Sequence, residues 1–270
     1  EDIKGEDKER EVKHINPYLV EGEDVLIESR TKPISSVPEI TYGNQPNDGG
    51  NFLFTPEEKD AFLENEPGAE PFIKELISAK EYLNGEKRYC LWLKDADPTV
   101  LKKLPKVLER VENVKKERSE STREATRDLA NYPTLFGFIK QPESDYIAIP
   151  RVSSENRDYI PMSFFDKGKI VGDTCLSVPN ATLYHFGILQ SEMHMVWVRY
   201  VCGRLKSDYR YSNNIVYNNF PWPKNVSEEN KKKVEKCVEY LLTVRTTFPH
   251  SSLADLYDPN TMPPDLRRAH

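Results

Sequence analysis

Long apolar runs are missing from this 270-residue sequence, in which hydrophobic residues make up 37% and charged residues 30%. No stretch approaches the roughly 18 uncharged apolar residues of a membrane-spanning helix, so we predict none. The start, Glu1–Glu6, lacks both an initiator methionine and the apolar core of a signal peptide, and we expect a piece of a longer parent chain. Aromatic residues reach 10%, which argues against a disordered chain.

Cysteine is scarce and its spacing is not that of a metal site. The sequence contains neither a Cys-x-x-Cys pair nor a Cys/His cluster, which predicts reduced, buried thiols and a cytoplasmic setting. The histidines likewise show no ligand-like spacing, and we expect His194 to be a hydrogen-bonded core residue. The four cysteines are Cys90, Cys175, Cys202 and Cys237.

Catalytic motifs are also missing. No Gly-x-Gly turn follows a predicted strand, as it would to hold S-adenosylmethionine. An amino-methyltransferase needs Asn/Asp-Pro-Pro-aromatic, but Asn16-Pro17-Tyr18 lacks the second proline and Asn219-Phe220-Pro221-Trp222 lacks the first. Glu57 and Glu58 follow Thr55-Pro56, which explains them as first-turn helix residues rather than as metal ligands of a nuclease. We therefore predict no catalytic, cofactor-binding or metal-binding residue in this chain.

The net charge of −6 by itself argues against binding nucleic acid, but the charge is uneven. Residues 1–132 carry 21 basic and 29 acidic side chains, a balance of −8. Residues 133–224 carry 10 and 8, a balance of +2, and residues 225–270 carry seven of each. The middle of the chain is therefore its only basic part.

The pattern of caps and short apolar runs predicts an α+β fold, with a mixed or antiparallel β-rich domain, peripheral helices and a C-terminal helical segment. Helices are expected to begin after Thr55, Asp97, Ser191 and Ser227, with Pro105 kinking the second. A polar loop is expected over 206–219, and the charged stretch 115–128 is either solvated or faces a polyanion. Strand-like runs cover 87–93, 135–139, 146–149, 159–165, 170–171 and 182–189.

Two polar segments have the composition of a nucleic-acid contact. Residues 151–157 join two predicted strands and carry Arg, Asn and Glu, which suit base edges, and Ser, which suits phosphate; a solvated hairpin loop is the alternative. Residues 203–213 combine Arg and Lys with two tyrosines, which suits a nucleic-acid backbone. A helix C-terminus whose dipole is complemented by Arg204 and Lys206 is the alternative there, and it leaves Arg210 unexplained.

Residues 187–223 resemble a known family. The stretches that carry the resemblance are Gly187-Ile188-Leu189, Met193-His194-Met195, Val201-Cys202-Gly203-Arg204-Leu205-Lys206-Ser207-Asp208-Tyr209-Arg210-Tyr211-Ser212-Asn213 and Tyr217-Asn218-Asn219-Phe220-Pro221-Trp222-Pro223. They look like the target-recognition domain of MmeI-like type IIG/IIL restriction–modification enzymes, and the match runs from about His14 to His270, nearly the whole chain.

The resemblance implies a DNA-reading module of a bacterial DNA adenine-N6 methyltransferase, often fused to a nuclease. The parent would flip an adenine and methylate its N6 from S-adenosylmethionine, and this chain would hold the duplex. Its expected partners are double-stranded DNA and the methyltransferase domain of the same parent. The implied division is a connector over 1–36, the recognition domain over 37–224 and the start of a helical spacer over 225–270.

We expect two groups of contacts under this hypothesis, and a packed corner at Phe220-Pro221-Trp222. The alternative function is a protein-interaction scaffold for a separate catalytic subunit. The residues expected to face the groove are Arg151, Ser153, Ser154, Glu155, Asn156 and Arg157. Those expected to contact phosphates or brace the methyltransferase domain are Arg204, Lys206, Arg210 and Tyr211.

Overall fold

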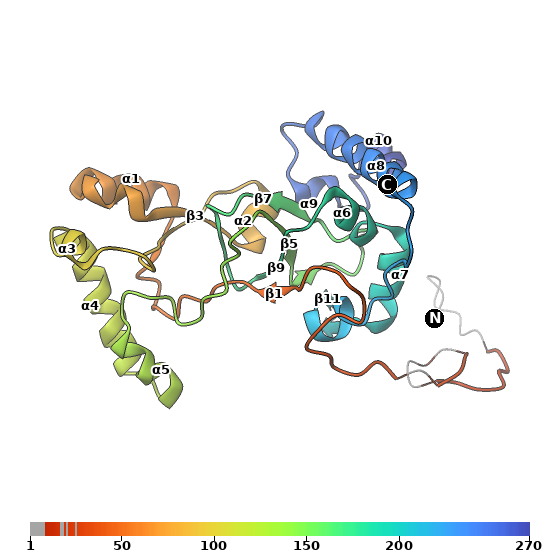
Figure 1. Cartoon of the computed structure of the whole chain (residues 1–270), viewed down its shortest axis with the longest axis horizontal. Coiled ribbons are helices and arrows are strands. Elements are labelled where there is room, and N and C mark those ends of the chain that lie inside the picture. The colour runs from red at the N-terminus through yellow and green to blue at the C-terminus, as the bar shows by residue number, and fades with distance from the viewer. Residues whose placement is uncertain (1–8, 17–18, 20, 25) are drawn as a thin grey trace.

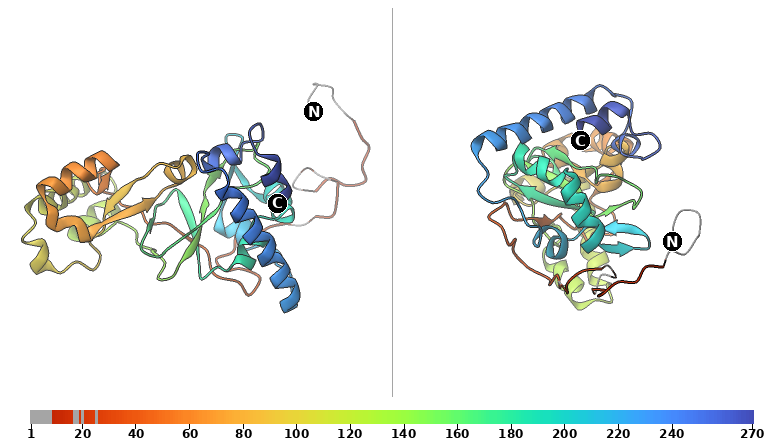
Figure 2. Two further views of the ribbon diagram at one scale, coloured as in Figure 1. Left: turned by 90° about the horizontal axis from the view of Figure 1, so that it is seen from above. Right: turned by 90° about the vertical axis from the view of Figure 1, so that its right-hand side faces the viewer.

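The chain folds into two lobes that lie side by side along its longest axis (Figure 1, Figure 2). The computed structural model describes residues 9–16, 19, 21–24 and 26–270. The expectation drawn from Glu1–Glu6, and parts of the predicted connector over 1–36, lie outside these residues. Residues 43–140 enter the chain between strands β1 (Thr41–Tyr42) and β5 (Tyr146–Pro150) of the main lobe. Together with strand β8 (Ile170–Val171), they form the insert lobe.

The strands form three sheets, in the orders β1-β9-β5-β7, β2-β4-β3-β8 and β10-β11-β6. Paired strands are antiparallel except β3 and β8, which run parallel. Together with the helices this confirms the α+β class. The strands are Thr41–Tyr42 (β1), Leu53–Phe54 (β2), Ile73–Ile77 (β3), Tyr89–Leu91 (β4), Tyr146–Pro150 (β5), Val152–Ser153 (β6), Ser163–Phe165 (β7), Ile170–Val171 (β8), Cys175–Pro179 (β9), Gly203–Leu205 (β10) and Asp208–Arg210 (β11).

The helices begin mainly at side chains that cap their first turn. The Thr55 side chain accepts a hydrogen bond from the backbone amide of Glu58, and the Glu58 carboxylate accepts one from the backbone amide of Thr55. Ser191 and Ser227 also cap their helices, as predicted. The helices are Pro56–Asn65 (α1), Pro67–Phe72 (η1), Ala79–Asn84 (α2), Pro98–Leu101 (α3), Pro105–Ser119 (α4), Glu124–Asp128 (α5), Leu129–Asn131 (η2), Leu183–Leu189 (α6), Glu192–Val201 (α7), Asn213–Tyr217 (η3), Glu228–Thr246 (α8), Leu253–Leu256 (α9) and Pro264–Ala269 (α10).

Five predicted elements differ from the observed ones. Of the predicted strand 159–165, only Ser163–Phe165 (β7) is a strand, because the carbonyls of 160–162 are bound by side chains instead of a neighbouring strand. Pro105 is the first residue of α4 and separates it from α3, instead of kinking one helix. Residues 182–189 are a helix, α6, and not a strand. Residues 206–219 are not a polar loop, because they contain the turn between β10 and β11, the strand β11 and the π-helix η3. Residues 135–139 form only an isolated bridge, between Phe138 and Gln45.

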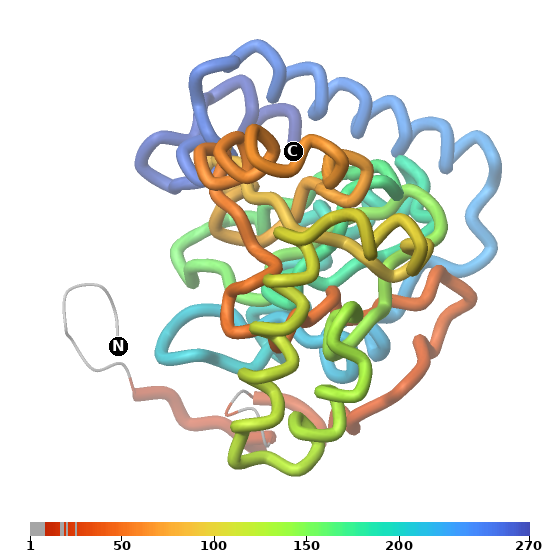
Figure 3. Tube along the Cα trace, turned by 90° about the vertical axis from the view of Figure 1, so that its left-hand side faces the viewer, coloured from red at the N-terminus to blue at the C-terminus, as the bar shows by residue number. Residues whose placement is uncertain are grey.

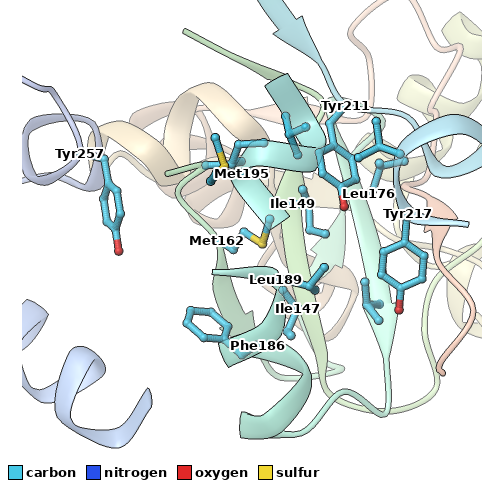
Figure 4. Packing of buried hydrophobic residues seen from close by; sticks show 14 of the residues in the cluster. Ile147, Ile149, Met162, Leu176, Phe186, Leu189, Met195, Tyr211, Tyr217 and Tyr257 are labelled. Atoms are coloured by element: carbon cyan, nitrogen blue, oxygen red, sulfur yellow. The ribbon is translucent and has the colours of Figure 1, made fainter. Parts of the chain in front are cut away.

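Each lobe has its own hydrophobic core. In the main lobe, Ile147, Ile149 and Leu176 of the β5–β9 pair pack with Phe186 and with side chains of the later helices (Figure 4). In the insert lobe, the sheet β2-β4-β3 packs against α4, which runs along one side of this lobe (Figure 3). The main-lobe core continues into residues 225–270, so the C-terminal helices are part of the main lobe.

Three of the four cysteines are buried, and one is exposed. Cys90, Cys175 and Cys202 are buried free thiols, but Cys237 is exposed. The prediction of four buried thiols is therefore wrong at Cys237, because Val238 and Leu241 occupy the buried face of α8. In the part of the chain that the structure describes, no helix is both long enough and apolar enough to span a bilayer.

Candidate nucleic-acid interface

The two polar segments singled out in the sequence are paired in one sheet. β6 lies antiparallel to β11, with Ser153 opposite Tyr209 and Val152 opposite Arg210. β10 pairs with the other edge of β11, with Arg204 opposite Tyr209. The β10–β11–β6 sheet thus brings together residues 56 to 58 positions apart in the chain. Neither segment signals this juxtaposition by itself.

Successive side chains along these strands point alternately into the protein and out to solvent, which decides which of them DNA could reach. Ser153, Tyr209 and Tyr211 point inward and are 2%, 3% and 2% exposed, whereas Val152 and Arg210 point outward. The Tyr211 hydroxyl pairs with the buried Nε2 of His194 at 2.9 Å. The prediction that Tyr211 and Ser153 contact DNA is corrected on this ground, since both lie inside the protein. The core role predicted for His194 is confirmed.

The turn that follows β6, residues 154–157, is held by its own backbone and by β11. The Ser154 carbonyl accepts from the amide of Arg157 at 3.2 Å, and its hydroxyl accepts from the amide of Asn156 at 3.3 Å. The Asp208 carboxylate of β11 accepts from the amide of Glu155 at 3.3 Å. We call residues 154–157 the recognition turn. It presents Glu155 and Asn156 as exposed side chains, and the role of Asp208 in holding it has no local sequence signal.

The two arginines that flank the recognition turn are half-buried. Arg151 donates from Nη1 to the carbonyl of Asp173 at 2.8 Å and stacks on the ring of Tyr42. Arg157 has its Nη1 3.5 Å from the Ser153 hydroxyl. Burial lowers the pKa of Arg157, and the nearby carboxylate of Asp258 opposes this shift. Both guanidinium groups retain free donors, since each carries five N–H groups.

The hairpin side chains are the exposed cations of this sheet. Arg204 stacks on Tyr209 at 4.1 Å and donates to the carbonyl of Ser207. Its Nη2 also lies 3.5 Å from the carbonyl of Arg199 in the last turn of α7, so the helix-capping interpretation applies to Arg204. Lys206 occupies the turn with a left-handed φ of 57°. Among the residues described, neither Lys206 nor Arg210 takes part in an ion pair, which leaves both positive charges uncompensated by direct contact.

The Tyr-Asn-Asn-Phe-Pro-Trp-Pro stretch holds the preceding chain rather than facing solvent. The Asn219 amide donates to the carbonyl of Glu28 at 2.9 Å and the Asn218 amide to that of Arg30 at 2.8 Å. The Tyr217 hydroxyl donates to the carbonyl of Pro38. These contacts fix residues 28–38 on η3, a role that sequence reasoning missed. Phe220 and Trp222 are buried against each other as predicted, at 3% and 4% exposure, while Pro221 is exposed.

The charged stretch 115–128 contains a structural arginine instead of a free basic surface. Arg118 is 1% exposed, and burial lowers its pKa. A polyanion therefore cannot reach it, and the polyanion alternative is wrong at this residue. Its donors reach the backbone carbonyls of Pro46, Asn47, Leu129, Tyr132 and Leu135 at 2.7–3.1 Å.

Within the described ranges, no cluster of His, Cys, Asp and Glu has the arrangement of a metal site. The candidate site is a polar and basic surface on an α+β scaffold, formed by the β10–β11–β6 sheet and the recognition turn. The chain belongs to the family described as "MmeI, target recognition domain", which matches residues 21–224. The family described as "MmeI, C-terminal domain" matches residues 226–270. These matches confirm the resemblance seen in the sequence.

Two individual proteins are similar over nearly the whole chain. DNA methyltransferase A of Bacillus subtilis (strain 168) is 42% identical over 259 residues, covering 96% of this chain and 29% of the relative. A solved structure of the type IIL restriction–modification enzyme MmeI in complex with DNA is 44% identical, with a TM-score of 0.93 over 96% of this chain and 34% of that one. This chain therefore spans about a third of the length of these relatives.

Proposed function

We propose that this chain is the DNA sequence-recognition module of a bacterial DNA adenine-N6 methyltransferase or restriction–modification enzyme, and that it binds duplex DNA. The observation that carries the proposal is the β10–β11–β6 sheet, which joins the recognition turn to the hairpin that bears Lys206 and Arg210. The DNA complex of the MmeI relative supports the same reading.

The proposed division of labour follows from exposure. Lys206, Arg210 and Arg204 present positive charge where phosphates of the duplex would approach, which gives affinity without sequence information. Glu155 and Asn156 extend from the recognition turn, and their side chains suit cytosine and adenine edges in the major groove. Arg157, with free donors beside Ser153, suits guanine.

Methyl transfer is assigned to the part of the proposed parent that lies outside this chain. S-adenosylmethionine does not fit the residues present, because no Gly-x-Gly turn occurs anywhere in the sequence. We therefore propose no catalytic residue here and no cofactor held by this chain. Residues 28–38, fixed on η3, would connect the module to the methyltransferase domain. The setting we propose is the cytoplasm, where such an enzyme meets DNA.

Salt dependence tests DNA binding directly. The 270-residue chain should bind a mixed-sequence duplex, measured by fluorescence anisotropy, with a log-linear loss of affinity as salt rises. Arg210→Ala should reduce the slope by about 1, since one phosphate contact is lost. Lys236→Ala is the matched control, because Lys236 is exposed on α8, away from β11 (Figure 1). We expect this control to keep the wild-type slope.

The outcomes separate this function from the alternative. Absence of salt-sensitive binding in the wild-type chain would favour a protein-interaction scaffold for a separate catalytic subunit. For the parent, N6-methyladenine should be mapped in DNA from cells that express it. A variant of Glu155 or Arg157 should change the methylated motif if the recognition turn reads bases. An unchanged motif with a reduced rate would instead give the turn a positional role.

A further inference from the structure

The five residues after the recognition turn have irregular backbone, and side chains satisfy most of their carbonyl groups. We call residues 158–162 the anchor segment. Buried carbonyls without a ladder partner need another donor, and each donor fixes the position of the carbonyl that it contacts. The donors are Arg199 to Asp158 at 3.4 Å, Gln190 to Ile160 at 2.7 Å, Tyr82 to Pro161 at 2.9 Å and Arg245 to Met162 at 2.8 Å.

Arg245 of α8 is the centre of this arrangement. Besides the Met162 carbonyl it contacts the Tyr257 hydroxyl, with Nε at 2.9 Å, and the Gln190 side-chain oxygen, with Nη2 at 3.3 Å. Gln190 in turn donates to the Ile160 carbonyl. A single guanidinium from the C-terminal segment thus holds one anchor carbonyl directly and orients the amide that holds another.

A second contact from the C-terminal segment lies next to the recognition turn. Arg267 of α10 forms an ion pair with Asp158, with Nη1 to Oδ2 at 2.7 Å. Asp158 directly follows Arg157, the last residue of the turn. The ring of His270 stacks on Tyr159 at 3.9 Å between centroids. Residues 225–270 therefore contact the first two residues and the last residue of the anchor segment.

We propose that Arg245 and Arg267 are positioning residues for the recognition turn, so that residues 225–270 form part of the recognition unit as well as a spacer. This inference rests on the proposed function. Base readout depends on hydrogen bonds of about 3 Å, so a shift of the anchor segment by about 1 Å misplaces the turn. Neither arginine needs to contact DNA for its loss to impair discrimination between sequences.

Hydrogen exchange tests the positioning without DNA. The amides of Glu155, Asn156 and Arg157 each have an acceptor in the turn or on β11. In Arg245→Lys, one ammonium cannot replace the bonds of the guanidinium fork, and we expect the peptide spanning 153–158 to exchange about threefold faster or more. Arg267→Ala should have the same direction of effect. The matched control is Arg268→Ala, because Arg268 pairs with Asp265 of its own helix.

A binding experiment tests whether the two arginines affect discrimination between DNA sequences. The probes are a duplex selected by the wild-type chain from a random-sequence pool and a scrambled duplex of equal length. We expect the ratio of the two dissociation constants to fall about tenfold in Arg245→Lys and about threefold in Arg267→Ala, with the salt slope unchanged. Arg268→Ala should keep the ratio. The exchanged pair Arg267→Asp with Asp158→Arg should restore it, because the ion pair forms again with its charges reversed.

Three results would decide against the positioning role. The first is an Arg245→Lys variant that keeps the wild-type exchange rate and the wild-type ratio of dissociation constants. The second is an exchanged pair that does not recover the ratio. The third is an Arg267→Ala variant whose salt slope falls by about 1 while both duplexes bind equally more weakly. The last result would make Arg267 a phosphate contact. Failure of the wild-type chain to bind either duplex would overturn the proposed function, while hydrogen exchange would still decide whether the C-terminal segment positions the turn.

Discussion

Single buried polar residues in the main lobe depend on specific partners. His194 is fully buried on α7, with Nε2 2.9 Å from the Tyr211 hydroxyl. Burial lowers the pKa of His194 from 6.5 to about 3. The folded protein therefore keeps this imidazole neutral at a pH where the unfolded chain protonates it. The stability that depends on neutral His194 is complete above about pH 6.5 and is lost as the pH falls toward 3.

The pH dependence of unfolding should report this residue. Between pH 7 and pH 5 the wild type should lose about 2 kcal/mol more of its free energy of unfolding than His194→Gln, since each pH unit below 6.5 costs about 1.4 kcal/mol. Urea unfolding followed by circular dichroism at both pH values measures the difference. His250→Gln, which changes an exposed histidine, should follow the wild type. Equal losses in wild type and His194→Gln would contradict the assignment.

What the sequence can predict about a residue depends on whether its neighbours along the chain determine its environment. His194 stands between two methionines in an apolar helix, and its core position follows from that pattern. Tyr211 and Arg210 cannot be separated in this way. Their opposite exposure follows from the alternation of side chains along β11, which ends at Arg210, and at Tyr211 directly after it. This alternation is visible only once the strand is known to pair with β6.

Two helices of the main lobe, α6 and α8, pack closely against each other. Gly187 of α6 lies against α8, where an added Cβ would come within 2.5 Å of Val234 and 2.8 Å of Val238. Such distances require the valine side chains or the two helices to shift, because real Cβ atoms essentially never approach so closely. Gly187 thus allows the contact that covers this side of the core.

Gly187→Ala should lower the free energy of unfolding by about 1–3 kcal/mol through overpacking, although alanine is the better helix former. Thermal unfolding of the purified chain measures the loss. Adding Val234→Ala should recover part of it by making room for the methyl group. Gly203→Ala is the control, because nothing lies within 4 Å of a Cβ added there. A neutral or stabilising Gly187→Ala would show that the helices do not need this contact.

Whether an element could be predicted depends on whether its signal is local in the sequence. Ser227 and Ser191 are local caps, so α8 and α7 begin where the sequence indicates. Residues 182–189 mix aromatic and β-branched side chains in a strand-like pattern, and packing on α8 overrides it. The β10–β11 turn was missed because Lys206 occupies a left-handed position that usually signals itself by glycine.

The described part of the molecule has three hydrophobic clusters: one in each lobe, and a smaller one formed by Ile77, Tyr146, Ala148, Val171 and Cys175. Only the main-lobe cluster contains residues of the C-terminal segment. The division at residue 224 stays a prediction about the parent chain, and the main-lobe core crosses it. The C-terminal segment, 225–270, contributes seven buried side chains to the main-lobe core. They are Val238, Leu241, Val244, Leu256, Tyr257, Met262 and Leu266. At about 1.5–3 kcal/mol for each buried side chain, their removal costs roughly 10–20 kcal/mol, which reaches or exceeds the total stability of about 5–15 kcal/mol typical of a domain.

A chain that ends at Lys224 should therefore lose the main lobe while the insert lobe persists. The insert-lobe core draws on residues between Phe52 and Ile170 and on none beyond residue 224. Native-state hydrogen exchange should show lost protection of the amides in β5 and β9 and retained protection in β3 and β4. Tyr240→Ala in the full chain, which changes an exposed residue of α8, should keep all four strands protected. Wild-type protection of β5 in the shortened chain would mean that the main lobe folds without residues 225–270, and that the buried side chains these residues add to the core are not needed to hold β5 and β9.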